Sequence, residues 1–158
     1  MHRLCALLED ASAGVRVAVV RALEAARGPE RDAAIGRAFE DSSAEVAGAA
    51  IGVARRTESI ALVPALTRFL ASKHAAEPRA EAARALAQLA GPESLRALCA
   101  QLTDGEYEVR LAIADALGIA GDASALEPLR SALDHEPDAD LQAAYREALA
   151  QISERIGR

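Results

Sequence analysis

Aromatic side chains are scarce in this sequence. They make up 3% of its 158 residues, and tryptophan is absent. Hydrophobic residues nevertheless account for 51% of the chain, so alanine, leucine, valine and isoleucine must supply the core. Alanine and leucine are strong helix formers. The composition therefore predicts an all-helical protein in which small side chains let the helices approach one another closely.

Cysteine and histidine are too few and too scattered to predict a disulfide framework or a metal site. The cysteines are Cys5 and Cys99, and the histidines are His2, His74 and His135. No HExxH motif or other paired-ligand spacing occurs among them, so we expect no metal. The sequence also lacks a glycine-rich phosphate loop and a GxSxG motif, and we expect no cofactor and no catalytic residues.

Positive charge is in deficit as well. The chain has 24 acidic and 18 basic residues, which gives a net charge of −6. This balance argues against binding to nucleic acid or to an anionic membrane. The longest uncharged runs, such as Val46 to Ala54, are too short to span a bilayer, and no signal peptide is visible. We therefore expect a cytoplasmic protein.

Three rows of residues recur along the chain with a period of 31 or 32 residues. The pair Val15-Arg16 aligns with the pairs that begin at Val46, Pro78, Val109 and Leu141. Two apolar rows follow the same rhythm: Leu4, Ile35, Leu66, Leu98 and Leu129, and Leu8, Phe39, Leu70, Leu102 and Leu133. Three rows in register over the whole length indicate a tandem repeat.

Each period contains two helical patterns. In the clearest one, Val109 and Leu117 share the face of a first helix, and Leu126 and Leu133 share the face of a second. Between them, Asp122 is placed to cap the second helix. The whole pattern predicts helices at 2–9, 13–26, 30–40, 44–56, 60–72, 77–90, 92–102, 106–119, 123–133 and 138–155.

These helices predict an all-α fold, an α-solenoid or superhelix of stacked antiparallel helix pairs with about ten helices. No linker divides the chain, so residues 1–158 are expected to form a single domain. Its register is a half repeat at 1–9, repeats at about 10–40, 41–72, 73–103 and 104–134, and a C-terminal half repeat at 135–158.

The stretch from Val109-Arg110 through Leu117-Gly118 to Leu126-Glu127-Pro128-Leu129 resembles the HEAT-like repeats of the phycobilisome-lyase type. The resemblance covers essentially the whole chain and implies an α-solenoid. It also implies that the second helix of each pair lines a concave surface. Such repeats serve many partners, so the resemblance indicates a fold more than a function.

The same resemblance implies a structural ladder of aspartates and arginines between repeats. The family places an aspartate in the turn, six residues before an arginine, and this chain has Asp10 before Arg16 and Asp104 before Arg110. The other two repeats keep one partner each: Asp41 with Ala47, and Ser72 with Arg79. We interpret these residues as links from repeat to repeat and not as ligand-binding groups.

A helical wheel places a row of arginines on or near the outer face of the second helices: Arg37, Arg68, Arg96 and Arg130, with Arg3 at its edge. Arginine binds carboxylates and phosphates through paired hydrogen bonds, so this row is the candidate binding site for an acidic protein segment. The alternative is an ordinary solvated surface on which neighbouring glutamates balance the arginines: Glu30, Glu93 and Glu127.

Three functions compete. The leading hypothesis is a non-catalytic protein-binding scaffold or adaptor, because a curved repeat surface without a catalytic constellation suits one. The second is a chromophore-lyase-like enzyme or subunit, which a deep apolar pocket would favour. The third is a HEAT-like nucleic-acid-binding protein, which a strongly positive groove would favour.

The end helices are predicted to keep apolar residues that a single neighbour cannot cover. These residues are Leu4, Leu7 and Leu8 in the first helix and Tyr145, Leu149, Ile152 and Ile156 in the last. Terminal repeats of a solenoid normally carry a polar outer face. We therefore expect a partner or a head-to-tail contact with another copy at one end.

Overall fold

The computed structural model describes residues 2–157, with side chains from Leu4 onward, and this part of the chain contains helices and no strands. The first helices are α2 (Ala13–Ala22), α4 (Ala44–Thr57), α6 (Ala76–Leu89), α8 (Tyr107–Ala120) and α10 (Ala139–Ile156). The second helices are α1 (His2–Ala6), α3 (Pro29–Ala38), α5 (Val63–Leu70), α7 (Pro92–Ala100) and α9 (Leu126–His135). Short 3-10 segments adjoin four of them: η1 (Leu7–Glu9), η2 (Leu23–Ala25), η3 (Ile60–Leu62) and η4 (Ala123–Ala125).

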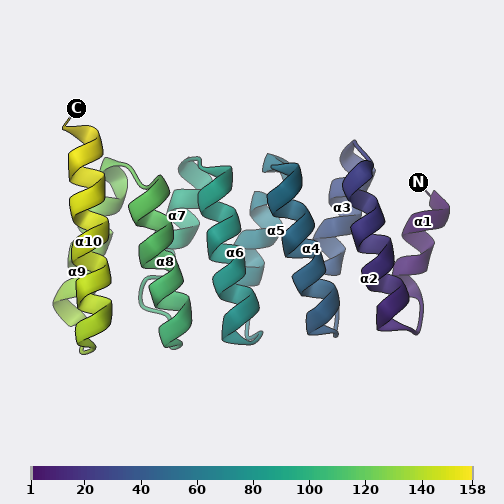
Figure 1. Ribbon diagram of the computed structural model, residues 1–158, viewed down its shortest axis with the longest axis horizontal. Helices are drawn as coiled ribbons and strands as arrows, with labels where there is room; N and C mark the ends of the chain where they lie inside the picture. The colour runs from purple at the N-terminus through teal and green to yellow at the C-terminus, as the bar shows by residue number, and fades with distance from the viewer. Residues whose placement is uncertain (1, 158) are drawn as a thin grey trace.

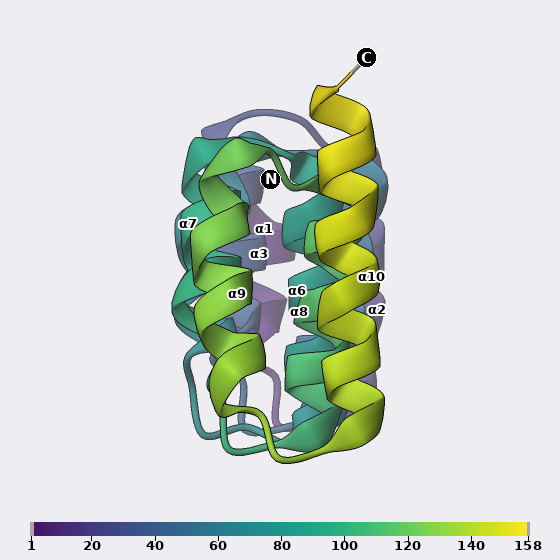
Figure 2. The ribbon, with the colours of Figure 1, turned by 90° about the vertical axis from the view of Figure 1, so that its left-hand side faces the viewer.

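The helices form two layers that run the length of the molecule. Figure 1 shows the first helices side by side in one layer and the second helices behind them, with α1 and α2 at one end and α9 and α10 at the other. Figure 2 looks along the stack and shows the two layers edge-on. Each first helix packs on the next, from α2 on α4 to α8 on α10. The predicted all-α solenoid is thereby confirmed.

Local sequence signals explain where the helices begin. Gly28 precedes α3 with a φ of 102°, a conformation that favours glycine, and Pro29 then occupies the first turn, where no N–H is needed. Asp122 accepts a hydrogen bond from the backbone N–H of Ser124, as its predicted capping role requires. Asp138 caps α10 by accepting the N–H groups of Asp140 and Leu141, each at 3.0 Å.

The core lies between the two layers and follows the sequence rows. Ile35, Leu66, Leu98 and Leu129, one from each of α3, α5, α7 and α9, are all fully buried. Alanines of the first helices, such as Ala50 and Ala82, are equally buried and let neighbouring helices lie close together. Burial of these apolar rows between stacked pairs is the main source of stability, because one pair alone could not cover its own face.

Candidate functional site

Arg16 joins the first two repeats on the side of the turns. Its Nε and Nη2 atoms donate to the two carboxylate oxygens of Asp41, each at 2.8 Å. Its Nη1 atom donates to the backbone carbonyl of Asp10, also at 2.8 Å. The bonded guanidinium holds the pKa of the Asp41 carboxyl below its ordinary value, and the N–H of Ser43 acts in the same direction. Arg16 therefore links the turn before α2 to the turn before α4.

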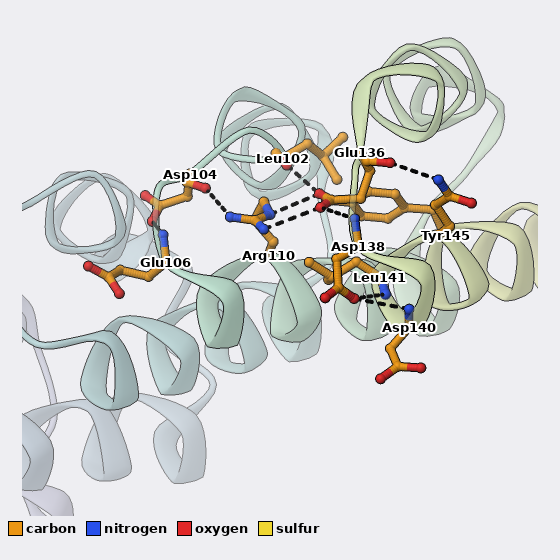
Figure 3. Close-up of polar contacts among 10 residues, drawn as sticks. Leu102, Asp104, Glu106, Arg110, Glu136, Asp138, Asp140, Leu141 and Tyr145 are labelled. Carbon is orange, nitrogen blue, oxygen red and sulfur yellow. Dashed lines mark hydrogen bonds and ion pairs between the residues drawn. The ribbon is translucent and has the colours of Figure 1, made fainter.

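Arg110 repeats this arrangement near the other end, as Figure 3 shows. Its Nε and Nη2 atoms donate to the carboxylate of Glu136 at 3.0 and 3.3 Å, and its Nη1 atom donates to the backbone carbonyl of Asp104 at 2.7 Å. Behind Glu136 lies Tyr145, whose hydroxyl donates to the carbonyl of Leu102 at 2.9 Å. Burial, with a contribution from Glu136, raises the pKa of Tyr145 to about 12.

A third link joins Arg79 to the Asp104 carboxylate. Arg79 also donates to the carbonyl of Leu70 at 2.8 Å, and the N–H of Glu106 donates to Asp104 at 2.9 Å. Only 7% of the Arg79 side chain and 10% of the Asp104 side chain are exposed, so solvent screens this pair weakly. The lack of an aspartate at Ser72 does not affect this link, because Arg79, like Arg16 and Arg110, bonds a backbone carbonyl before its helix and not a side chain there.

The structure shows how the ladder is built, and it differs in detail from the sequence-based interpretation. Each arginine binds the backbone carbonyl in the preceding turn and the carboxylate one repeat further on, 25 or 26 residues away. The partners that sequence reasoning missed are Asp41 for Arg16, Asp104 for Arg79 and Glu136 for Arg110. A search for Arg–carboxylate pairs at that separation would have found all three. Ala47 and Ser72 occupy the remaining pair of positions, so the ladder has a gap between α4 and α6.

The four arginines of the candidate binding row lie on four successive second helices and are all exposed: Arg37 on α3, Arg68 on α5, Arg96 on α7 and Arg130 on α9. Arg130 pairs with Glu127 within its own helix at 2.5 Å, and Arg68 lies 3.9 Å from Glu40 on α3. Among the described side chains, Arg37 and Arg96 make no ion pair. Arg3, at the edge of the row, lies outside the described side chains.

Two shallow furrows cross this face. The furrow between α1 and α3 has a volume of about 500 Å³, and its lining includes Cys5, Ala33 and Arg37. The furrow between α3 and α5 has a volume of about 410 Å³, and its lining includes Gly36, Ala65 and Arg68. Arg37 lines both, so it stands on the ridge between them. Acidic residues also line the two furrows: Glu9, Glu30, Asp32 and Glu40.

The described cysteines and histidines lie apart from one another in the stack. Cys5 and Cys99 are free and half-buried, and burial raises the pKa of the Cys99 thiol, which keeps it protonated at neutral pH. His74 stacks on Phe69 with ring centroids 4.7 Å apart, and His135 bonds the carbonyl of Ser131 at the end of α9. His2 lies outside the described side chains. Across residues 2–157 no cluster of histidine, cysteine, aspartate or glutamate is arranged to hold a metal ion.

Comparisons with known proteins place the chain in a family. The model of HEAT repeats matches residues 63–150, and the chain belongs to that family. The match concerns HEAT repeats in general and gives no support to the narrower phycobilisome-lyase type. No curated protein matches the chain. Within the described residues, no helix is long and apolar enough to cross a membrane.

Two solved structures are similar to this one, and both are crystal structures of engineered proteins. The first is 25% identical, with a TM-score of 0.61, and the match covers 96% of this chain and 78% of the other. The second is 27% identical, with a TM-score of 0.58, and the match covers 95% of this chain and 47% of the other. The likeness therefore extends over nearly the whole stack of helices.

Proposed function

We propose that this chain is a non-catalytic protein-binding module and that it holds an acidic segment of its partner against the outer face of the second helices. The observation that carries the proposal is the position of Arg37. It lines two neighbouring furrows, is exposed, and makes no ion pair among the described side chains. A partner carboxylate can bind such a guanidinium through two parallel hydrogen bonds.

The two furrows beside Arg37 form the rest of the proposed binding surface. Alanines line both furrows and Gly36 lines the second, so the backbone or small side chains of a bound segment can approach closely. The acidic residues that also line the furrows favour a protein ligand over a nucleic acid, because a phosphate backbone would meet Glu30 and Glu40 wherever it met Arg37 and Arg68. A segment that places carboxylates at the arginines and neutral or basic residues between them suits this face best. The open, shallow form of both furrows offers little to a buried chromophore.

A charge-reversal experiment tests the proposal. Selection from a displayed random-peptide library with the wild-type chain is expected to enrich peptides that contain several carboxylates. The triple variant Arg37→Glu, Arg68→Glu and Arg96→Glu is expected to lose these peptides. Because the three side chains are exposed, its melting temperature should stay nearly unchanged.

The matched control makes the same change of net charge on the other layer. Arg21, Arg84 and Arg146 are exposed on α2, α6 and α10, and their replacement with glutamate is expected to leave peptide binding intact. Retention of the same peptides by the second-helix variant, or their equal loss in both variants, would show that the row of arginines is only solvated surface.

A further inference from the structure

Both phenylalanines of the sequence lie at the C-terminal ends of α3 and α5, beside the furrow between these helices. The ring centroids of Phe39 and Phe69 are 6.1 Å apart, and the ring of His74 stacks on Phe69. Together with Ala65 and Ser72, the three rings line a hollow of about 140 Å³, which we call the aromatic hollow. It gathers rings in a chain that has few of them.

The aromatic hollow continues the α3–α5 furrow. Glu40, Ala65 and Arg68 line both the hollow and the furrow of about 410 Å³. A segment that lies in the furrow can therefore place one of its side chains in the hollow.

The hollow has the size of one large apolar side chain. An apolar protein cavity of about 150 Å³ is large enough to bind benzene, and the volume here is about 140 Å³. Its inner walls are apolar: Phe39 and Phe69 are 1% and 4% exposed, and Ala65 is half-buried. The other lining residues are polar and, apart from Ser72, exposed, so they border the mouth.

The charges at the mouth favour carboxylates next to such an apolar side chain. Arg68 and Glu40 lie 3.9 Å apart, and their side chains are 66% and 74% exposed. An ion pair this exposed contributes little, so Arg68 is free to bind a second carboxylate. Lys73, in the turn beside the hollow, is exposed and makes no ion pair among the described side chains. Arg37 lines the adjoining furrow and adds a third positive charge.

The repeat itself does not require this hollow. The positions that correspond to Phe69 in the other repeats hold Ala38, Gln101 and Ala132, and those that correspond to His74 hold Ser43, Glu106 and Asp138. Helix pairs therefore stack without aromatic rings at these two positions. The rings of this repeat are available for a role other than stacking.

We propose that the aromatic hollow binds one large apolar side chain, such as leucine or phenylalanine, from the acidic segment held by the second helices. The inference rests on the proposed function and narrows its ligand to a segment with an apolar anchor close to a carboxylate. Arg68 borders the hollow, and an extended chain advances about 3.3 Å per residue. A carboxylate bound to Arg68 should therefore lie within about three residues of the anchor.

Peptide selection tests for the anchor. A displayed library of random peptides is selected on the wild-type chain and on Ala65→Met, whose longer side chain is expected to occupy the hollow. The wild-type chain should enrich acidic peptides that share a large apolar residue near a carboxylate, and Ala65→Met should enrich acidic peptides without that preference. Ala144→Met is the matched control, because Ala144 is also half-buried and lines a furrow of about 220 Å³ between α8 and α10. It should enrich the same peptides as the wild type.

A second variant tests the hollow without filling it. His74 is exposed, so His74→Ala should leave the fold intact. On the wild-type chain, replacing the shared apolar residue of an enriched peptide with alanine should raise the Kd at least roughly tenfold. On His74→Ala the same replacement should have a clearly smaller effect, because the hollow has lost one wall. His135→Ala, which changes an exposed histidine at the end of α9, is the matched control and should keep the full effect.

The outcomes separate the anchor from the proposed function. Acidic peptides without a shared apolar residue on the wild-type chain would overturn the anchor and leave the proposed function standing. An equal loss of the preference in Ala65→Met and Ala144→Met, or an undiminished effect of the peptide substitution on His74→Ala, would also overturn the anchor. Enrichment of no acidic peptides at all would overturn both.

Discussion

Single residues link neighbouring repeats by bonding in two directions at once. Arg16 and Arg110 each bind a backbone carbonyl in the turn before their own helix and a carboxylate in the turn before the next first helix. Each side chain therefore fixes the separation of two successive turns. The Arg16–Asp41 pair leaves 13% of each side chain exposed. Two-point bonding of this kind fixes geometry more firmly than a single contact between exposed charges.

The lowered pKa of Asp41 leads to a prediction about acid stability. A carboxyl whose pKa is lower in the folded chain stabilises the fold above its unfolded pKa of about 3.9, and this contribution is lost as the pH falls through the folded pKa. Asp41→Asn should therefore lower the free energy of unfolding at neutral pH, and the deficit should shrink below about pH 4. Urea titrations at several pH values measure it.

Asp115→Asn is the matched control, because the exposed side chain of Asp115 makes no hydrogen bond or ion pair among the described residues. It should change stability little at any pH. A deficit for Asp41→Asn that does not depend on pH would show that the Arg16 bond is not its origin.

At the scale of one helix, α4 combines two unfavourable features. Its interior holds Gly48 and Gly52, and it lies on one side of the gap in the ladder, where Ala47 and Ser72 replace the arginine and the carboxylate. The hollow of about 290 Å³ between α4 and α6 is lined by both glycines. The compensating contacts here are exposed, such as Arg55 with Glu81 at 3.0 Å. We therefore expect this junction to be less stable than its neighbours.

Replacing glycine with alanine should have opposite effects on stability at Gly48, where there is room for a methyl group, and at Gly121, where there is none. Nothing lies within 4 Å of a methyl group added at Gly48, so Gly48→Ala should raise the free energy of unfolding by roughly 0.5–1 kcal/mol. Gly48 is therefore not needed for a close approach between helices. A methyl group at Gly121 would overlap the Leu117 carbonyl and lie 2.8 Å from Ile152, so Gly121→Ala should destabilise. Thermal melts measure both, and equal effects would contradict this account.

Amide hydrogen exchange tests the weakness of the α4 junction. The buried amides of α4 are expected to exchange faster than those of α8, because α8 carries Arg110 of the ladder and packs on both α6 and α10. Both helices have 14 residues and lie inside the stack, which makes the comparison fair. Slower exchange in α4 than in α8 would mean that the missing link costs the solenoid nothing locally.

At the scale of the whole molecule, the sequence period predicts the fold well. The expected helix at 44–56 is α4 (Ala44–Thr57), and the one at 138–155 is α10 (Ala139–Ile156). Such agreement follows because each repeat must bury the same rows of apolar residues. The carboxylate partners of Arg16 and Arg110 escaped prediction because the expected spacing pairs each arginine with the aspartate six residues before it, whereas the bonded carboxylate lies 25 or 26 residues further on. The expectation that Tyr145 and Ile152 stay partly uncovered is wrong, because both are fully buried. Their burial escaped prediction because α10 packs on both α8 and α9, which the wheel of one helix does not show.

The row of arginines remains a prediction at this scale. The structure places Arg37, Arg68, Arg96 and Arg130 on one layer, and acidic side chains lie among them. A helical wheel finds which residues point outward, but the furrows depend on how far apart successive second helices lie. Those distances follow from side-chain sizes in the core, which is why Arg37 stands out only in three dimensions.

The measurement that tests the central claim most directly is a chemical-shift map of the labelled chain with an enriched acidic peptide. Binding across the second helices predicts perturbed backbone amides in α3, α5 and α7, with side-chain shifts at Arg37 and Arg68 and little change in α4, α6 and α8. Perturbations gathered on the first helices, or spread evenly over both layers, would contradict the proposal that the second-helix face is the binding surface.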